Sequence, residues 1–181
     1  ACISGAANLT VAKVGAAKWF TNEIVLSSST EDDKVNLKVM GDYTNAAILP
    51  VTFGGEAVAV DGDVKYDNGI LTLTNAFKNN KKKHGIRNLC LIAEKDGKYY
   101  NIKTQVTVIT KEISDINTLT AALTPDEGSS AVYGYYRLSK DLSSNGWYSV
   151  GYAEKWSAVQ RSNAELGFRG TFDGNGKTIS S

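Results

Sequence analysis

The residues with the clearest chemical potential in this sequence are aromatic side chains in its C-terminal third. An exposed Trp or Tyr ring can stack on a sugar, because its apolar face meets polarised C–H groups while its polar edge stays in water. Trp147, Tyr152 and Trp156 lie in turn-rich sequence, which favours exposure at the surface. We predict them as glycan-stacking residues, whose ligand would be a polysaccharide or a host or cell-surface glycan.

A hydrophobic end cap is the competing interpretation of the same aromatic density. Tyr136, Leu138, Phe168 and Phe172 would alternate inward on strands, because successive side chains of a strand point to opposite faces. We expect these four side chains to be buried, and the sequence favours the cap over the glycan site.

A carboxylate and an amide alternate in Asp173-Gly174-Asn175-Gly176, as oxygen ligands do in a calcium loop. Lys177 stands where a third oxygen ligand would be needed, and no Glu follows at the twelfth position. Asn-Gly is also typical of tight turns, because both residues tolerate positive φ angles. We therefore expect a turn between two strands and no metal site. One His and two Cys also leave too few ligands for a zinc centre of the Cys/His type.

Lys81-Lys82-Lys83-His84 is a cluster of basic residues that could bind sulfated or phosphorylated glycans. The flanking Phe77-Lys78-Asn79-Asn80 and Gly85 are loop-like, however, and favour a solvated hairpin loop. We expect the loop, and His84 has no partner motif that would give it a catalytic or ligand role.

Catalytic machinery has little support in the sequence. No serine lies in G-x-S-x-G, and the glycines near the C-terminus do not precede a helix as a phosphate loop would. Glu154 and Glu165 are conceivable as a pair of glycosidase carboxylates, yet nothing around them singles them out. We expect that the chain is not an enzyme and holds no cofactor.

Composition narrows the class of partner. The 181 residues are 42% hydrophobic and 22% charged, with a net charge of +1. This balance gives no electrostatic reason to bind nucleic acid or an anionic membrane. No run approaches the roughly 18 apolar residues that span a bilayer.

The two cysteines leave several states open. Cys2 could be the lipid-bearing residue of an exported lipoprotein, a partner of Cys90 in a disulfide, or a chance cysteine in an extended segment. Cys90 lies in the apolar run Leu89-Cys90-Leu91-Ile92-Ala93, where a thiol behaves as a small buried hydrophobe. The sequence favours two free thiols.

Residues from about 8 to 110 are patterned as short strands separated by turns. Val35, Leu37 and Val39 alternate with polar residues, which predicts a half-buried strand. Hairpins are predicted at Asp67-Asn68-Gly69 and Asp96-Gly97, which supply the positive φ angles of a type I′ turn. The predicted strands and apolar runs are 48–53, 57–60, 64–66, 70–74, 89–95 and 98–109. Seven or eight strands favour an antiparallel sandwich, and a barrel fits the same pattern.

The pattern changes after Thr110. Ser114 or Asp115 can cap a helix over 116–123, in which apolar residues recur with helical spacing. A strand at 133–138 follows. We place the domain boundary at about 110–113.

Two resemblances suggest an identity. By size and strand rhythm the first segment resembles the immunoglobulin-like modules of secreted bacterial proteins. Residues 113–181 resemble the opening of the right-handed parallel β-helix domains of bacterial cell-surface proteins, whose core motif F-x-G-T-F-D-G-N-G-x-T-I is matched by 168–179. The short helix, the Y-x-L-x-x-D-L strand at 136–142 and the W-x-x-x-G segment at 147–151 fit the same family.

The resemblances imply a mainly β chain with two domains. Residues 1–110 are expected to form an immunoglobulin-like antiparallel β-sandwich, and 111–181 a short helix, the N-terminal cap and the first rung of a truncated parallel β-helix. They imply a secreted or cell-surface bacterial protein.

The expected function is a non-catalytic structural or adhesion module of a larger surface protein. The alternatives are a carbohydrate-binding module, or the non-catalytic front end of a β-helix polysaccharide lyase or hydrolase. An unfinished β-helix exposes sheet edges, through which two copies of the chain could pair, and added downstream rungs are expected to abolish such a dimer.

Overall fold

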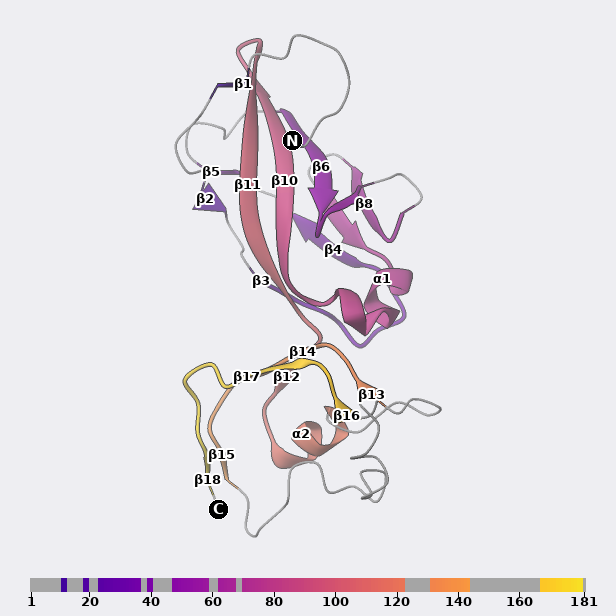
Figure 1. The fold of residues 1–181 in the computed structure, drawn as a ribbon, viewed down its shortest axis with the longest axis vertical. Coiled ribbons are helices and arrows are strands. Elements are labelled where there is room, and N and C mark those ends of the chain that lie inside the picture. The colour runs from indigo at the N-terminus through magenta and orange to yellow at the C-terminus, as the bar shows by residue number, and fades with distance from the viewer. Residues whose placement is uncertain are drawn as a thin grey trace. The chain divides into compact units, whose positions relative to one another are not determined.

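The computed structural model describes residues 11–12, 18–19, 23–36, 39–40, 47–58, 62–67, 70–122, 131–143 and 167–180. The chain divides into two compact parts: unit 1 is Ala1–Asn80 with Ile86–Val108, and unit 2 is Lys81–Gly85 with Ile109–Ser181. Strands make up most of the regular structure (Figure 1), so the predicted mainly-β class is confirmed.

Unit 1 contains two principal sheets. The larger has the strand order β1 (Val11–Ala12), β11 (Lys98–Ile109), β10 (Gly85–Lys95), β6 (Ala47–Phe53), β7 (Glu56–Ala57), and β3 (Glu23–Val25) also pairs with β11. The smaller has the order β4 (Asp33–Asn36), β9 (Ile70–Leu73), β8 (Val64–Asp67). A separate ribbon joins β2 (Lys18–Trp19) to β5 (Val39–Met40), and one helix, α1, spans Asn75–Asn79.

Both predicted hairpins are confirmed. Strands β8 and β9 are antiparallel with Asp67 opposite Ile70, so two residues connect them. Asp96 and Gly97, between the neighbouring strands β10 and β11, have φ angles of 53° and 69°. Positive φ at both central residues defines the turn that matches the twist of two antiparallel strands. The Asp96-Gly97 dipeptide therefore fixes its hairpin locally, whereas Asn68 and Gly69 lie outside the described residues.

The described residues of one predicted strand pair in two different sheets. The alternation over Val35, Leu37 and Val39 indicated a half-buried strand. Strand β4 belongs to the smaller sheet and β5 pairs with β2, and Leu37 and Lys38 between them lie outside the described residues. The alternation specifies which side chains share a face and leaves the pairing partner undetermined.

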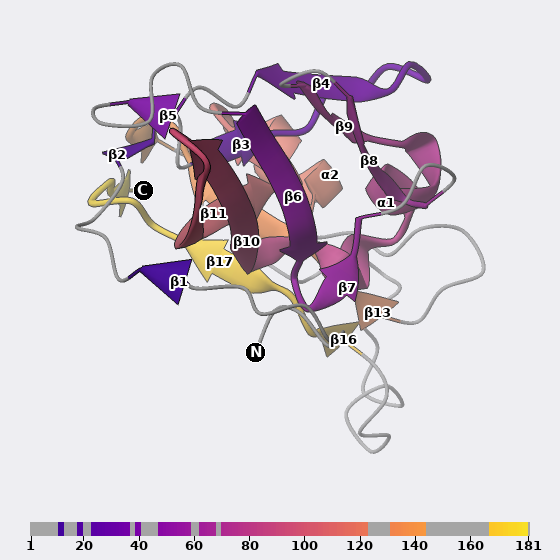
Figure 2. The ribbon, with the colours of Figure 1, turned by 90° about the horizontal axis from the view of Figure 1, so that it is seen from above.

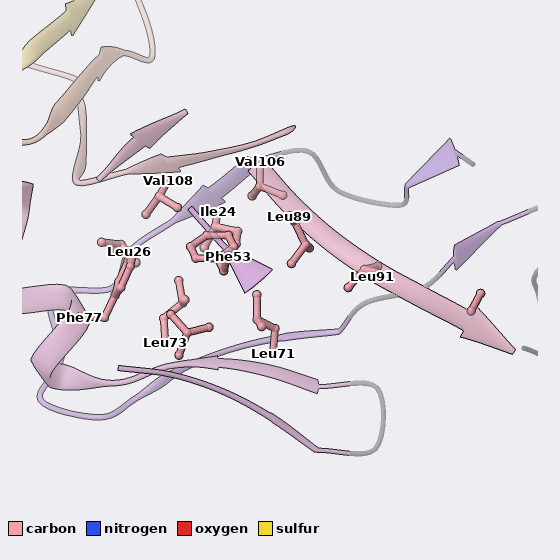
Figure 3. Packing of buried hydrophobic residues seen from close by; sticks show 12 residues of the cluster. Ile24, Leu26, Phe53, Leu71, Leu73, Phe77, Leu89, Leu91, Val106 and Val108 are labelled. Atoms are coloured by element: carbon pink, nitrogen blue, oxygen red, sulfur yellow. The ribbon is translucent and has the colours of Figure 1, made fainter. Parts of the chain in front are cut away.

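The core of unit 1 is built from both principal sheets. Leu71 and Leu73 of β9 are fully buried with Leu89 and Leu91 of β10 in one hydrophobic cluster, joined by Val108 of β11. Figure 3 shows these side chains gathered between the strands, and Figure 2 shows β11, β10 and β6 as a layer apart from β4, β9 and β8. Burial of a Leu or Val side chain stabilises a fold by about 1.5–3 kcal/mol. The two layers are therefore held by a shared core.

Cys90 is buried in β10 and is a free thiol. The prediction of a free, hydrophobe-like cysteine is confirmed for this residue. Cys2 lies outside the described residues, and its state stays a prediction.

The segment before the basic cluster is helical, and the expected hairpin loop is wrong. Thr74 caps α1, because its side chain accepts a hydrogen bond from the Phe77 N–H at 3.5 Å. Phe77 is buried, with its ring centroid 5.9 Å from that of Phe53. Lys81–Lys83 then form a 3₁₀ turn, η1. A cap and one buried aromatic residue outweigh a composition that is typical of loops.

Lys78 of α1 is held by a single loop. Its Nζ donates to the carbonyl oxygens of Ser29, at 2.9 Å, and of Glu31. Nζ also donates to Ser27 Oγ at 3.3 Å, and it lies 3.4 Å from the Asp33 carboxylate. The Lys78 side chain is only 7% exposed. The Lys78 ammonium group therefore holds the loop of residues 27–33 in place through these contacts.

Unit 2 has a different architecture. Its elements besides η1 are β12 (Lys111–Ile113), α2 (Ile116–Ala122), β13 (Ala131–Val132), β14 (Tyr135–Leu138), β15 (Leu142–Ser143), β16 (Gly167–Phe168), β17 (Thr171–Asp173) and β18 (Ile179–Ser180). The strands form three small sheets, β12-β14-β17, β13-β16 and β15-β18, and every pairing within them is parallel.

The parallel pairings stack two successive passes of the chain. We name residues 131–143 the first coil and residues 167–180 the second coil. The register places Val132 opposite Phe168, Tyr136 opposite Phe172 and Leu142 opposite Ile179. Strand β12 is paired to β14 of the first coil. The predicted cap and first rung of a β-helix stay predictions.

Helix α2 is capped and packed as predicted. Asp115 Oδ1 accepts the Thr118 N–H at 2.7 Å, which satisfies a donor that the helix itself leaves free. Leu119 and Ala122 are buried in one cluster with Tyr136 and Leu138. The apolar stripe of the helix therefore covers the core of the first coil.

The end-cap prediction is confirmed in part. Tyr136 and Leu138 are buried, and Phe168 is partly buried with its ring centroid 6.1 Å from that of Tyr136. Phe172 was expected to be buried and is exposed. It lies on the last strand of its sheet, so no neighbouring strand in the described residues covers it.

Candidate functional site

The predicted glycan-stacking residues Trp147, Tyr152 and Trp156 lie outside the described residues, as do Glu154 and Glu165. Their roles stay predictions. The described candidates all belong to unit 2, where side chains from distant parts of the sequence meet along the two coils.

The Asp173-Gly174-Asn175-Gly176 segment forms the expected tight turn. Asn175 and Gly176 have φ angles of 48° and 66°, and the Lys177 N–H donates to the Gly174 carbonyl at 2.7 Å. Asp173 accepts hydrogen bonds on both oxygens, from the Asn175 N–H at 2.8 Å and from the Tyr135 hydroxyl at 2.9 Å. Both oxygens of the Asp173 carboxylate are thus used in hydrogen bonds within the protein.

The turn is also fastened to the first coil. The Asn175 side-chain amide donates to the Leu138 carbonyl at 3.1 Å. The Thr178 N–H donates to Asp141 Oδ1 at 2.8 Å, and the Leu142 N–H donates to the Thr178 carbonyl at 2.8 Å. The three hydrogen bonds therefore join the two coils, and the oxygens of this turn have a structural role. Within the ranges that the structure describes, no group of three or more His, Cys, Asp or Glu side chains could hold a metal ion.

Three charged residues lie in register across the sheet β12-β14-β17, and we call them the charged ladder. Glu112, Arg137 and Asp173 occupy matching positions on the three strands. Arg137 Nη2 donates to Glu112 Oε1 at 2.6 Å. Cross-strand pairs of opposite charge contribute roughly 0.2–1 kcal/mol each. The sequence did not indicate this ladder, because only the register shows which acids lie opposite Arg137.

His84 has a specific partner, which the sequence did not indicate. Its Nδ1 lies 2.8 Å from Thr110 Oγ1, and the same hydroxyl accepts the Tyr135 N–H at 2.8 Å. The Lys82 ammonium lies 4.7 Å from the centroid of the Tyr133 ring. Polar and cation–π contacts therefore join the basic segment to the rest of unit 2.

Two glycines, Gly134 and Gly170, allow close packing in unit 2. Gly134 has a φ of 123°, and a Cβ there would lie 2.5 Å from Thr110 Oγ1. A Cβ at Gly170 would lie 2.5 Å from the Gly134 carbonyl oxygen. Both distances are far below a van der Waals contact. A side chain at Gly134 would collide with Thr110, and one at Gly170 would collide with the backbone of the first coil.

An open, polar hollow of about 300 Å³ lies beside the start of α2. It is lined by Ser114, Asp115, Ile116, Asn117, Lys140, Asp141, Leu142 and Ser143. The hydrogen bond from the Thr118 N–H is the main cause that holds the pKa of Asp115 below its usual value of 3.8. Asp115 and Asp141 are both engaged in hydrogen bonds that order the backbone. The two carboxylates that line the hollow therefore stabilise the local backbone.

Comparison with known proteins does not assign the chain to a family. No protein-family model matches the chain, and no curated protein shows significant sequence similarity to it. Within the described ranges, none of the helices has the length and hydropathy of a membrane-spanning segment.

Proposed function

We propose that this chain is a non-catalytic structural or adhesion module of a larger, secreted or surface-attached bacterial protein. In this proposal unit 1 is an immunoglobulin-like sandwich, and unit 2 is the N-terminal cap and the first coils of a right-handed parallel β-helix. The observation that carries the proposal is the in-register parallel stacking of the two coils. A stack of parallel coils is an architecture that extends by repetition and presents long side faces.

Three residues of the 168–179 motif support the β-helix assignment, because each contacts the coil before it. Phe168 packs on Tyr136 of the coil before it. Gly170 permits the close approach to Gly134. Asn175 takes the positive φ of the turn and bonds to the first coil. Motif residues that serve contacts between coils are what a repeating scaffold requires.

Helix α2 supports the assignment of an N-terminal cap. Its buried Leu119 shares a cluster with Leu138 and Leu142 of the first coil. A stack of coils needs such a cover at its start, since each coil buries its apolar side chains only against its neighbours. The two-layer core of unit 1 supports the sandwich, because a single cluster there is built from both sheets.

The proposal is tested by locating the native protein. An antibody raised against this chain should detect, on fractionated cells of the source organism, a surface or secreted band much larger than 19.5 kDa. Protease treatment of intact cells should remove this band. A band of 19.5 kDa confined to the cell interior would contradict the proposal.

A further inference from the structure

Tyr133, at the corner between β13 and β14, carries a cation over its ring. The Lys82 ammonium lies 4.7 Å from the ring centroid. The segment that bears Lys82 is fixed by the contact between His84 Nδ1 and Thr110 Oγ1 at 2.8 Å. The Tyr133 carbonyl in turn accepts the hydroxyl of the buried Tyr136 at 2.9 Å. Lys82 is exposed, and it therefore presents its charge at the surface from an ordered position.

Arg169 occupies the equivalent corner of the second coil. Strands β13 and β16 pair in parallel with Val132 opposite Phe168, and the Arg169 N–H donates to the Val132 carbonyl at 2.8 Å. Arg169 follows Phe168 as Tyr133 follows Val132, so Arg169 and Tyr133 are matching positions. Neighbouring strands lie about 4.8 Å apart, and residues in register point to the same face. The exposed Arg169 side chain therefore belongs beside Tyr133.

The two cations lie on opposite sides of Tyr133 along the direction in which the coils stack. Strands β12 and β17 pair with opposite edges of β14. Thr110, which contacts the basic segment, donates its N–H to the Tyr135 carbonyl on the side of β12. Lys82 therefore reaches Tyr133 from that side, whereas Arg169 lies on the side of the second coil. We name Lys82, Tyr133 and Arg169 the cationic row.

The acids of the adjacent sheet are already used within the protein. Glu112 pairs with Arg137 at 2.6 Å, and Asp173 accepts the Tyr135 hydroxyl at 2.9 Å. Among the described residues, the Arg169 guanidinium has no ion-pair partner. Neighbouring like charges destabilise a sheet when no opposite charge lies between them. The cationic row thus has positive charge that an anion from outside the chain can balance.

We propose that the cationic row binds an acidic polysaccharide that runs along the stack of coils. This inference rests on the proposed adhesion role and names the class of its ligand. Carboxylate or sulfate groups of the polymer pair with Lys82 and Arg169, and the planar guanidinium can hold two oxygens at once. A sugar ring between these groups lies against Tyr133. Because the whole chain has a net charge of only +1, the attraction is local and does not extend to every polyanion.

Calorimetric titration of the 181-residue chain with heparin, polygalacturonate and neutral dextran tests this proposal. We expect heparin or polygalacturonate to bind, which distinguishes sulfate from carboxylate recognition, and dextran not to bind. The double variant Lys82→Glu, Arg169→Glu should lower the affinity at least about tenfold, because both contacts become repulsive. The matched control Lys98→Glu, Lys103→Glu changes the net charge equally at exposed positions of β11 and should bind within about twofold of the wild type. Binding of neither acidic polymer, an equal loss in the control, or equally tight binding of single-stranded DNA would overturn the proposal.

An NMR titration of the wild type locates the site without any substitution. Addition of the polymer that binds should shift the amide resonances of Lys82, Tyr133 and Arg169 and leave that of the buried Leu71 in unit 1 unchanged. Shifts that exclude these three residues would contradict the cationic row. A protein that is found at the cell surface but binds none of these polymers would overturn this inference alone, because the antibody experiment decides the location independently.

Discussion

Single residues decide how closely the two coils stack. At Gly170 even one methyl group would collide with the backbone carbonyl of Gly134, whereas a Cβ at Gly174 would meet nothing within 4 Å. Both glycines belong to the same motif, and the sequence alone does not distinguish them. The difference lies in the neighbouring coil, which approaches one position and leaves the other open.

Gly170→Ala is therefore expected to destabilise unit 2 by about 1–3 kcal/mol, the usual cost of overpacking. Gly174→Ala is the matched control and should change the free energy of unfolding by less than about 0.5 kcal/mol. Urea unfolding followed by circular dichroism measures both. Equal effects of the two substitutions would show that the close approach at Gly170 does not limit stacking.

Asp115 links the stability of α2 to pH. Its pKa in the folded chain lies below the usual 3.8, first because the carboxylate accepts the Thr118 N–H. The carboxylate therefore contributes stability above pH 3.8, and this contribution disappears as the pH falls through the lower folded-state pKa. In an NMR titration the Asp115 carboxyl carbon should show a midpoint below 3.8.

Asp115→Asn provides the control for this pH dependence, since Asn is also a good helix cap but does not titrate there. The stability of the wild type relative to this variant should decline on acidification. A constant difference between them across that range would contradict the assigned cause.

At the scale of elements, some helices and turns are determined by neighbouring residues and others by contacts between distant segments. The Asp96-Gly97 hairpin and the Asp115 cap were predictable, because each depends on φ angles or hydrogen bonds within a few residues. The helices α1 (Asn75–Asn79) and η1 (Lys81–Lys83) could not be predicted from the local sequence. They depend on Phe77 entering the core of unit 1 and on loop 27–33 closing around Lys78, both far away in sequence.

Lys78→Met should accordingly destabilise unit 1 by about 1.5–3 kcal/mol, the range for hydrogen bonds to a charged group. The substitution leaves the carbonyls of Ser29 and Glu31 without their donor and Asp33 without its counter-ion. Lys103→Met, at an exposed position of β11, should have an effect within about 0.5 kcal/mol. Thermal unfolding of the two variants measures the difference, and equal melting temperatures would refute the central role of Lys78.

At the scale of the whole molecule, the described residues form two separate hydrophobic clusters. One contains Leu71 and belongs to unit 1, and the other contains Leu138 and belongs to unit 2. Each unit buries its own apolar side chains, which is the property of parts that unfold as distinct cooperative units.

Leu71→Ala should lower the stability of unit 1 by about 2–5 kcal/mol, and Leu138→Ala should do the same for unit 2. Each substitution is the control for the other. Hydrogen exchange resolved by residue should show protection lost in the unit that carries the change and retained in its neighbour. Loss of protection throughout the chain in either variant would show that the two units unfold together.

The sequence by itself determined the mainly-β class, the two hairpins, the cap of α2 and the turn at Asn175-Gly176. Each of these follows from alternation or from the φ preferences of adjacent residues. Only the tertiary structure decided that Lys78 is enclosed, that Glu112, Arg137 and Asp173 form a ladder, and that Phe172 is exposed. These features depend on which distant segments become neighbours, and the period of a strand specifies its faces without specifying its partners.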